Sequence, residues 1–559
     1  MGLIVNGGHG RHQLRFDEKR IDAMFAALDR SDLPGAAVGI SVEGRPVYRK
    51  AFGLANMELP VALSTAIRMR IGSTSKHFTA LAYMLLCEDG LATIDDPIGR
   101  HLPELHAVSR DVTMRQLMSN TSGLRDVIDL AWQFSGMGPR VSAAALLSQY
   151  QRIDDVSAPP GRAWIYNNGG WMLVGAAVER LSGMSLDQVL RERIFDPIGM
   201  YETRLRRWDD DFLPNSATLH VQWQPYDQVE MGEPTDTPQF QKLALGTEDL
   251  GQGGIVSTID DMLRWLAHMD SPVVGSEATW ALMQEPVKLA NGTCTGYGFG
   301  LFRGAYRGLD TMYHSGGVLG GTTQMLKVPS LRTNIIVITN RSDVLAPLIV
   351  NRMLDEMVSD LDSRPVDAKI ARPAVGVFAA ASGNPVVQLI DRDHQQFIAI
   401  NGAELPAAAD ADNILWPSGI WEYERRGVCI KGEPKAPTAI AYDDYGTVES
   451  IPRAAPCQAA DEVRLVGTYG WLANGTELEI SRCGDRLEMV SRGPFGTCSF
   501  ALDPIAERTW RANPVGLRPR WATIVLDQDG KHFTFSSLLN WSVRFARSAD
   551  DPAHSDEER

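Results

Sequence analysis

Apolar residues recur along the first part of the chain at helical spacing in some segments and at strand-like spacing in others. Residues 17–30 carry apolar side chains on one helical face, which predicts a helix. Two β-rich runs follow on either side of Glu43-Gly44, a pattern typical of a hairpin. Residues 73–88 are mostly apolar and end at Asp89-Gly90, a helix stop signal. A helix that is apolar nearly all round is a buried helix, so we expect 73–88 inside the core.

Further helical patterns are followed by strands. The helical patterns lie at 113–119, 143–151, 169–182, 185–195 and after Ser257-Thr258, and the β-like runs at 297–302, 322–329 and 334–339. The order is a strand pair, then helices, then strands again. It predicts an α/β (α+β) core in which the N-terminal hairpin joins the later strands in one antiparallel sheet, beside a helical region.

The pattern changes again near residues 361–382, beyond which helical periodicity nearly vanishes. Short alternating runs separated by Gly, Asp and Asn turns predict small β-barrels or sandwiches, and the turn-rich residues 453–462 would separate two of them. A chain of 559 residues is also too long for one hydrophobic core, because cores stop growing near ~250–300 residues. We therefore predict three domains, at 1–362, 370–456 and 460–550.

The charge balance narrows the classes of partner. The 69 acidic and 54 basic residues give a formal net charge of −15, whereas a nucleic-acid binder needs a basic face to displace counterions. The same charge disfavours docking on anionic membranes. The N-terminus lacks the apolar core of a secretory signal, and no stretch reaches the roughly 18 apolar residues of a membrane span. We expect a cytoplasmic protein with no nucleic-acid or membrane partner.

The cysteines and the short motifs argue against a bound metal. Six cysteines without a CxxC pair disfavour a disulfide scaffold or a zinc ribbon and favour reduced, mostly buried thiols. The chain contains no HExxH, GxGxxG or Walker loop. We therefore expect no metal and no cofactor.

Candidate chemistry begins at the start of the predicted buried helix, in the run Ile71-Gly72-Ser73-Thr74-Ser75-Lys76. Residues three apart share a helix face, so Ser73 and Lys76 should point into the same space. A serine hydroxyl is a poor nucleophile until a base takes its proton, and a lysine with a lowered pKa can act as that base. The helix N-terminus adds partial positive charge where an oxyanion would develop. Alone, the pattern also fits an ordinary buried helix start.

A second candidate is Tyr166, in a loop that starts at Pro160-Gly161 and runs on as Tyr166-Asn167-Asn168. A tyrosinate near Lys76 can share the proton transfer. Asn168 can donate to a substrate carbonyl and accept from Lys76. The alternative is a packed aromatic residue and a turn asparagine.

A third candidate is the run Tyr313-His314-Ser315-Gly316-Gly317, just before a predicted strand. A Gly-rich strand edge lets a substrate lie along the backbone. The N–H groups of Gly317 and Ser73 would then form an oxyanion hole, with His314 beside the scissile group. The alternative is a surface histidine in a glycine turn.

In this order and spacing, the three motifs resemble the signature of the penicillin-recognising serine hydrolases. That family includes class C β-lactamases, D-Ala-D-Ala carboxypeptidases, related esterases and D-aminopeptidases. Further stretches resemble family motifs, namely 117–124 (LMSNTSGL), 193–200 (RIFDPIGM), 253–262 (GGIVSTIDDM) and 297–301 (YGFGL). The resemblance covers roughly residues 20–358 and implies a serine β-lactamase/transpeptidase-like catalytic domain with a central antiparallel sheet. It assigns Ser73 as nucleophile, Lys76 and Tyr166 as proton-transfer partners, and Asn168, His314, Gly316 and Gly317 to substrate and oxyanion binding.

Two departures from the family pattern narrow the expected activity. Many β-lactamases and carboxypeptidases carry Lys-Thr-Gly where this chain has His314-Ser315-Gly316, a change similar to D-aminopeptidases and several esterases. The histidine of the family's LLxHTSGL stretch is replaced by Asn120, and Arg125-Asp126 follow, which also resembles D-aminopeptidases. The chain offers no candidate for the class A glutamate that activates the deacylating water. We do not expect efficient β-lactam hydrolysis.

The last part of the chain resembles the two eight-stranded antiparallel β-barrels of D-aminopeptidases, in which a loop of the last barrel reaches the active site and restricts substrates. By position, that loop is 512–521 here, and it holds Arg518 and Arg520. Arginines suit a substrate carboxylate and do not suit a free ammonium group. They leave room for a peptidase of acidic or carboxylate-terminated substrates, such as linearised microcystin. The alternative is two solvated surface arginines.

Together these observations predict a serine peptidase or amidohydrolase that cleaves short peptides or amino-acid amides, including ones with D-residues, through a Ser73 acyl-enzyme. A carboxylesterase on the same scaffold and a non-enzymatic binding protein that kept the pocket are the rival classes. The natural substrate and the oligomeric state stay open, with a homodimer as one candidate.

Overall fold

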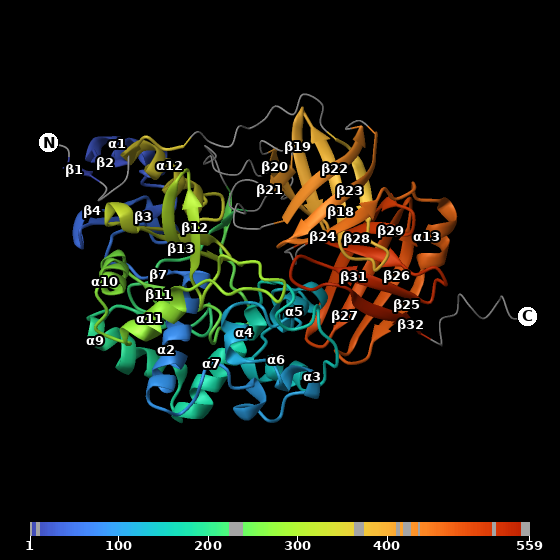
Figure 1. Ribbon diagram of the computed structural model, residues 1–559, viewed down its shortest axis with the longest axis horizontal. Helices are drawn as coiled ribbons and strands as arrows, with labels where there is room; N and C mark the ends of the chain where they lie inside the picture. The colour runs from blue at the N-terminus through green and yellow to red at the C-terminus, as the bar shows by residue number, and fades with distance from the viewer. Residues whose placement is uncertain are drawn as a thin grey trace, which may run out of the picture. The chain divides into compact units, whose positions relative to one another are not determined.

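A computed structural model describes residues 3–6, 12–222, 239–362, 374–409, 414–417, 426–433, 436–516 and 521–548 of the protein (Figure 1). The chain divides into two compact units. The first comprises Met1–Asp96, Trp171–Val287 and Gly296–Ser363, and the second comprises Pro97–Gly170, Lys288–Thr295 and Arg364–Arg559. Ser73, Lys76 and His314 belong to the first unit, and Tyr166 and Asn168 to the second. The predicted domain boundaries stay predictions.

A six-stranded antiparallel sheet lies at the heart of the first unit (Figure 1). Its strands, in the order in which they pair, are β12 (Phe302–Tyr306), β13 (Leu309–Val318), β14 (Gly321–Val328), β15 (Thr333–Thr339), β3 (Ala36–Val42) and β4 (Arg45–Phe52). Every residue of β15 and β3 is buried, as their Val- and Ile-rich sequences require. β3 and β4 are the predicted hairpin, so the prediction that it joins the later strands in one antiparallel sheet is confirmed.

Two helices pack on this sheet. α10 (Ile259–Asp270) contacts β3 and β15, and α12 (Ala346–Met357) contacts β14 and β15. Gly39 permits the close approach of α10, because a Cβ at this position would lie 2.7 Å from the Ile259 side chain. The Thr258 side chain accepts the Asp261 N–H and caps α10. This cap explains why the helix begins directly after the Ser257-Thr258 pair.

α2 (Lys76–Glu88) is the buried helix that its apolar run predicts, and every residue from Lys76 to Leu86 is buried. Ser73 lies just outside its α-helical part, because Gly72–Ser75 forms the 3-10 turn η2 directly ahead of α2. The nucleophile candidate therefore sits on a tight turn that leads into the buried helix.

The strand predicted over 297–302 is wrong for 297–301, since β12 begins only at Phe302. Gly300 has a φ of 77°, a left-handed conformation that interrupts a strand. A Cβ on Gly300 would lie 2.7 Å from the backbone nitrogen of His77. This segment therefore packs against the start of α2 and does not extend the sheet.

The second unit contains short capped helices. They are α3 (Ala107–Arg110), α4 (Met114–Met118), α5 (Val127–Ser135), α6 (Ala143–Tyr150) and the first residues of α7 (Asn168–Ser182). The side chains of Thr113, Asp126 and Ser142 accept backbone N–H groups at the starts of α4, α5 and α6. The helices predicted at 113–119, 143–151 and 169–182 are confirmed.

Two antiparallel sheets complete the second unit. The first runs in chain order from β17 to β24: β17 (Gly376–Ala379), β18 (Val386–Arg392), β19 (Gln395–Ile400), β20 (Ala403–Ala409), β21 (Ile414–Pro417), β22 (Arg426–Glu433), β23 (Ala436–Asp444) and β24 (Thr447–Pro452). A bridge between Phe378 and Arg453 ties its first strand to the end of its last, which makes the sheet barrel-like.

The second sheet is a closed barrel of β25 (Gly467–Trp471), β26 (Thr476–Cys483), β27 (Arg486–Gly493), β28 (Gly496–Ala506), β29 (Thr509–Pro514), β30 (Ala522–Leu526), β31 (His532–Ser536) and β32 (Val543–Arg547). Buried and exposed residues alternate along β26, as a barrel wall requires. The prediction of two antiparallel barrels after the α/β core is confirmed.

The remaining elements are short. The strands are β1 (Leu3–Asn6), β2 (Gln13–Phe16), β5 (Leu54–Asn56), β6 (Val61–Ala62), β7 (Met69–Arg70), β8 (Arg204–Leu205), β9 (Val221–Gln222), β10 (Phe240–Gln241), β11 (Ile255–Ser257) and β16 (Val358–Ser359). The helices and turns are α1 (Glu18–Met24), η1 (Ala26–Leu28), η3 (Ile98–Arg100), α8 (Leu186–Leu190), η4 (Arg191–Phe195), α9 (Asp196–Ile198), α11 (Glu277–Gln284), η6 (Pro329–Leu331) and α13 (Ala459–Leu465). Among the described helices, none is both long and apolar enough to cross a membrane.

Candidate active site

Ser73 lies where the turn η2 and the strand β13 approach backbone to backbone. A Cβ on Gly316 would lie 1.9 Å from the Ile71 carbonyl oxygen, and a Cβ on Gly72 would lie 2.9 Å from Gly317 N. Gly72 has a φ of 52°, in the left-handed region that favours glycine. The glycines at 72 and 316 therefore allow Ser73 to sit beside the edge of β13.

Lys76 contacts Ser73 directly. Its Nζ donates to Ser73 Oγ at 3.0 Å and to the Gln252 carbonyl oxygen at 2.7 Å. The Lys76 side chain is completely buried in the first unit. A buried amine within hydrogen-bond reach of a serine hydroxyl has the geometry that a general base needs.

The loop 248–252 fixes the carbonyl group that Lys76 contacts. Gln252 Oε1 accepts the backbone N–H groups of Leu250 and Gly251, each at 3.1 Å. Gln252 Nε2 donates to Asp249 Oδ1 at 3.1 Å. Thr79, on α2, donates its hydroxyl to the Gly251 carbonyl oxygen at 2.9 Å. Lys76 therefore has a second acceptor that is held in place from both the loop and the helix.

A buried ion-pair network lies next to this loop. Arg70 Nη1 donates to Asp249 Oδ2 at 2.9 Å, and Arg70 Nη2 pairs with Asp209. Burial raises the pKa of Asp249 to about 6, although Arg70 pulls it the other way and Lys76 does so more weakly. Asp249 is ionised above this pH, and its carboxylate then balances the positive charge of Arg70.

His314 lies on β13 as a buried, neutral ring. Its Nδ1 is 2.6 Å from the Ser315 carbonyl oxygen, and its Nε2 is 3.1 Å from the Tyr297 hydroxyl. Because a carbonyl oxygen only accepts, Nδ1 carries the hydrogen and Nε2 accepts from Tyr297. Burial, and secondly the charge of Lys76, lowers the pKa of His314 to about 3. The alternative of a surface histidine is therefore wrong, while its role toward substrate stays a prediction.

The sequence did not identify Tyr297, Gln252, Asp249 or Arg70 as members of this site. Tyr297 belongs to the run 297–301 that resembles a family motif, but the sequence of this run does not predict its hydrogen bond to His314. Gln252 acts through its backbone carbonyl oxygen, a group that every residue carries. The sequence signal for the ion pair of Arg70 and Asp249 would have been two opposite charges in segments that are otherwise expected to be buried.

Tyr166 and Asn168 lie in the second unit, at the start of α7. The N–H groups of Asn168 and Gly169 donate to the two carboxylate oxygens of Asp126, at 2.8 Å and 3.1 Å. Tyr166 is partly buried and packs against the apolar cluster that includes Leu538 and Leu539. The meeting of Tyr166 and Asn168 with Ser73 and Lys76 stays a prediction.

Asn120 and Asp126, two residues of the second departure from the family pattern, have local structural roles in the second unit. Asn120 has a φ of 58°, a conformation that asparagine tolerates better than most residues. Its Oδ1 accepts the Asn167 N–H at 3.3 Å. Asp126 caps α5 by accepting the N–H groups of Ile128 and Asp129 while it also holds the start of α7. Both residues therefore shape the backbone around Tyr166.

Arg518 and Arg520 lie outside the described residues. Of the predicted substrate loop 512–521, the described parts are the end of β29, residues 515–516 and Trp521 ahead of β30. The proposed contact of these arginines with a substrate carboxylate stays a prediction.

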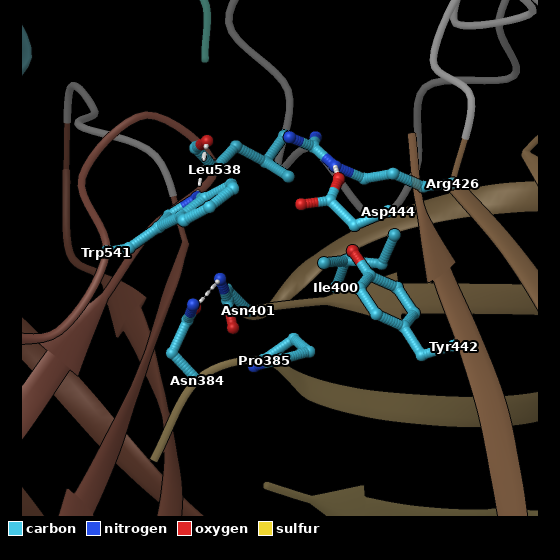
Figure 2. A pocket seen from close by; sticks show the side chains of 9 residues that line it. All are labelled: Asn384, Pro385, Ile400, Asn401, Arg426, Tyr442, Asp444, Leu538 and Trp541. Carbon is cyan, nitrogen blue, oxygen red and sulfur yellow. Dashed lines mark hydrogen bonds and ion pairs between the residues drawn. The ribbon is translucent and has the colours of Figure 1, made fainter. Parts of the chain in front are cut away.

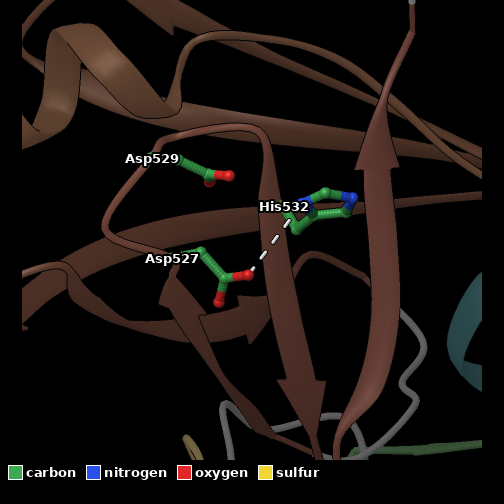
Figure 3. A group of neighbouring side chains, drawn as sticks. All are labelled: Asp527, Asp529 and His532. Carbon is green, nitrogen blue, oxygen red and sulfur yellow. Dashed lines mark ion pairs between the residues drawn. The ribbon is translucent and has the colours of Figure 1, made fainter.

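One group of acidic and histidine side chains among the described residues is close enough to hold a metal ion. It consists of Asp527, Asp529 and His532 at the turn between β30 and β31 (Figure 3). His532 Nδ1 is 4.0 Å from Asp527 Oδ2, and Asp529 Oδ1 accepts the Lys531 N–H at 2.8 Å. These side chains are partly or fully exposed and form bonds within the turn, so we assign no function to the group.

Comparisons with known proteins fit this site and fold. Residues 21–356 match the family described as Beta-lactamase. Penicillin-binding protein 4* of Bacillus subtilis is 25% identical over 450 residues, which cover 78% of this chain and 98% of that protein. A D-aminopeptidase of Cereibacter sphaeroides is 28% identical over 329 residues, which cover 57% of this chain and 60% of the relative.

Among solved structures, the octameric penicillin-binding protein homologue of Pyrococcus abyssi has the same fold. Its TM-score is 0.53 at 16% identity, and the superposition covers 95% of this chain and 100% of that one. The chain belongs to the beta-lactamase family, and the prediction of a serine hydrolase related to D-aminopeptidases is confirmed.

Proposed function

We propose that the protein is a serine peptidase or amidohydrolase that cleaves short peptides or amino-acid amides, D-residues included, through an acyl-enzyme on Ser73. The observation that carries this proposal is the 3.0 Å hydrogen bond between Lys76 Nζ and Ser73 Oγ, in a buried site beside a glycine strand edge. The similarity to D-aminopeptidases supports an amide substrate over a β-lactam.

In the acylation step, Ser73 Oγ attacks the substrate carbonyl carbon and gives up its proton to Lys76, with Tyr166 sharing the transfer. The N–H groups of Ser73 and Gly317 stabilise the oxyanion. The C–N bond then breaks, and the Tyr166 phenol protonates the departing amine.

In the deacylation step, a water molecule attacks the acyl-enzyme and gives its proton to the same pair. The C–O bond to Ser73 breaks, the carboxylic acid leaves and the serine regains its proton. Asn168 orients the substrate amide, and His314 contributes as a neutral ring, because protonation of its buried site is strongly unfavourable.

The glycine at 317 supports a substrate that lies along β13. Among the described residues, no atom lies within 4 Å of the position that a Cβ on Gly317 would take. Its Cα therefore borders open space, while the neighbouring Gly316 is packed against Ile71. A peptide or amide backbone fits an edge of this kind, because it can pair with the strand without meeting a side chain.

The test compares Ser73→Ala with Ser31→Ala, a substitution at an exposed serine of the same unit. Both proteins are assayed on the amides and p-nitroanilides of D- and L-alanine and on short-chain p-nitrophenyl esters. We expect Ser73→Ala to lose activity on every substrate that the wild-type protein cleaves, and Ser31→Ala to keep it. Full activity of Ser73→Ala contradicts the proposal, and a wild-type preference for esters over amides favours a carboxylesterase.

Digestion of a peptide library, read by mass spectrometry, then defines the substrate. Release of N-terminal D-residues supports the amidohydrolase proposal. Cleavage next to acidic or C-terminal carboxylate groups favours instead a peptidase of linear acidic peptides, for which Arg518 and Arg520 are the candidate contacts.

A further inference from the structure

The connection between β31 and β32 of the last barrel, residues 537–542, bonds to Asp126, the residue that caps the start of α5. Asn540 Oδ1 accepts the Asp126 backbone N–H at 3.0 Å, and Asn540 Nδ2 donates to the Asp126 carbonyl oxygen at 3.3 Å. Asn540 Nδ2 also donates to Asp129 Oδ2 at 3.0 Å. Asn540 is completely buried, so each of these bonds replaces one that water would otherwise make.

The residue that Asn540 holds in turn holds the start of α7. The Asp126 carboxylate accepts the N–H groups of Asn168 and Gly169 at 2.8 Å and 3.1 Å. Asp126 is itself completely buried, and so its carboxylate has little freedom to move alone. A shift of the Asp126 backbone would therefore move the residues that follow Tyr166.

The same connection packs against Tyr166 with its apolar residues. Leu538 and Leu539 are buried members of the cluster on which Tyr166 packs. The Trp541 side chain packs against Ala163 and Ile165, on the stretch that leads to Tyr166. Residues 537–542 therefore contact the stretch before Tyr166 directly, and they reach the helix start after Tyr166 through Asp126.

Two arginines, Arg125 and Arg426, contact Trp541. Arg125 donates to the carbonyl oxygen of Trp541 and binds Asp155 through Nε, at 3.0 Å. Arg426, on β22, donates to the Trp164 carbonyl oxygen at 3.4 Å and stacks its guanidinium 5.5 Å from the Trp541 ring. Both arginines are buried, and each has a carboxylate partner, Asp155 for Arg125 and Asp444 for Arg426.

Figure 2 shows how the rest of this region is lined. Trp541 and Leu538 face Arg426 and Asp444 across a small cavity of about 20 Å³, with Tyr442 below the ion pair. The Trp541 ring centroid lies 5.5 Å from the Arg426 guanidinium carbon, and the same side chain packs against Ala163 and Ile165. Asn540 therefore bonds to Asp126 and Asp129 at the start of α5, and Ser537 donates to Asp129 Oδ2 at 3.1 Å, while Trp541 and the two leucines supply apolar packing.

We propose that Asn540 is a positioning residue for Tyr166 and Asn168, so that the last barrel supplies part of the geometry of the reaction. The inference rests on the proposed function, since it assigns to Asn540 the placement of the phenol that protonates the leaving group. Asn540 acts through Asp126 and does not itself contact the substrate.

A positioning role for Asn540 predicts different effects on amide and ester cleavage, whereas a role in general stability predicts the same effect on both. An amine leaving group must be protonated as it departs, whereas p-nitrophenolate leaves without a proton. A displaced Tyr166 therefore slows amide cleavage more than p-nitrophenyl ester cleavage. A loss of folded protein lowers both rates by the same factor.

The experiment measures kcat and KM of Asn540→Ala on alanine amide and on an alanine p-nitrophenyl ester. We expect kcat for the amide to fall by about tenfold to a hundredfold, with KM and the ester rate much less affected. Arg482→Ala is the control, because Arg482 lies on β26 of the same barrel and donates to a carboxylate, Glu462, at 2.5 Å on the exposed surface. It should keep the wild-type ratio of the two rates.

A charge swap keeps the proposal testable if Asn540→Ala does not fold. Asn540→Asp places a carboxylate against Asp129 and against the Asp126 carbonyl oxygen and should lower the amide-to-ester ratio. The added change Asp129→Asn supplies an amide donor to the new carboxylate and should restore part of the ratio, because the Asp126 carbonyl oxygen still lacks its donor. An unchanged ratio in folded Asn540→Ala or Asn540→Asp, or a folded double variant without recovery, overturns the inference. If Ser73→Ala is fully active, the proposed function itself has failed, and the two failures are thereby distinguished.

Discussion

The Gln252 carbonyl oxygen accepts a hydrogen bond of 2.7 Å from Lys76 Nζ, and the same amine donates to Ser73 Oγ. The Gln252 side chain closes its own loop by accepting two backbone N–H groups, so the carbonyl cannot turn away without breaking them. The position of the amine is thus set by the loop 248–252 as well as by α2. A base held by two acceptors needs little rearrangement before it accepts the serine proton.

The first prediction concerns the base itself. Lys76→Ala should lower kcat/KM by about 10²- to 10⁴-fold, the usual contribution of a general base. Lys76→Arg should be nearly as poor, because a guanidinium keeps the charge but does not give up its proton. Steady-state assays on the best substrate measure both. Lys19→Ala, at an exposed lysine of α1, is the control, and a Lys76→Arg protein with wild-type kcat/KM would show that Lys76 is no base.

The second prediction uses two adjacent glycines that differ in their surroundings. A Cβ on Gly316 would overlap the Ile71 carbonyl oxygen at 1.9 Å, whereas a Cβ on Gly317 meets no described atom within 4 Å. Gly316→Ala should therefore lower the free energy of unfolding by about 2 kcal/mol or more, because backbone atoms must shift. Gly317→Ala should remain close to wild type in stability. Urea unfolding measures both, and equal losses in the two variants would contradict the packing of β13 against η2.

The third prediction concerns the hydrogen bond between Tyr297 and His314. Tyr297→Phe removes the donor and leaves the buried His314 Nε2 without its partner, which should cost about 1–3 kcal/mol of unfolding free energy. Tyr201→Phe, at a tyrosine that is 63% exposed, should cost almost nothing. Denaturant unfolding of the two variants provides the comparison. A Tyr297→Phe protein as stable as Tyr201→Phe would mean that the bond contributes nothing.

The fourth prediction concerns acid. Burial lowers the pKa of His268 to about 4 in the folded protein, against an ordinary value of 6.5 for histidine. Between these two values the unfolded chain binds a proton that the folded chain does not, so stability is present above pH 6.5 and is lost as pH falls toward 4. At pH 5 this amounts to about 2 kcal/mol, since one unit of pKa is worth about 1.4 kcal/mol.

His268→Gln should remove that share of the acid sensitivity. The unfolding free energy of the variant and of the wild-type protein is measured at pH 8 and at pH 5. We expect the wild-type protein to lose about 2 kcal/mol more than the variant between these conditions. An equal loss in both proteins would show that His268 gains its proton as readily in the folded protein as in the unfolded chain.

Much of the fold could be predicted because each element carried a local signal. Hydrophobic periodicity predicts both the element and its buried face in three places, namely the run 73–88, the hairpin at Glu43-Gly44 and the alternating runs after residue 374. The run 297–301 misled the prediction, because Gly300 turns the chain against His77 by a close backbone approach that has no hydrophobic period.

The site was less predictable for a related reason. Ser73 and Lys76 are three residues apart and share a turn, so their contact follows from local geometry. Asn540 and Asp126 are 414 residues apart, and their bond depends on how a barrel turn meets a helix start. No pattern within either segment predicts that contact, and the role of the loop 512–521 that sequence position suggested stays a prediction.

The central claim is that Ser73 is the residue that becomes acylated. The most direct measurement is mass spectrometry of protein quenched during turnover of an alanine p-nitrophenyl ester, followed by trypsin digestion. Cleavage after Arg70 and Lys76 releases residues 71–76, and fragmentation separates Ser73 from Ser75. We expect the alanyl mass on Ser73 in the wild-type protein and none on this peptide in Ser73→Ala. An alanyl adduct on another residue would contradict acylation of Ser73. So would turnover with no adduct on this peptide, if the Ser73→Ala variant is as active as the wild-type protein.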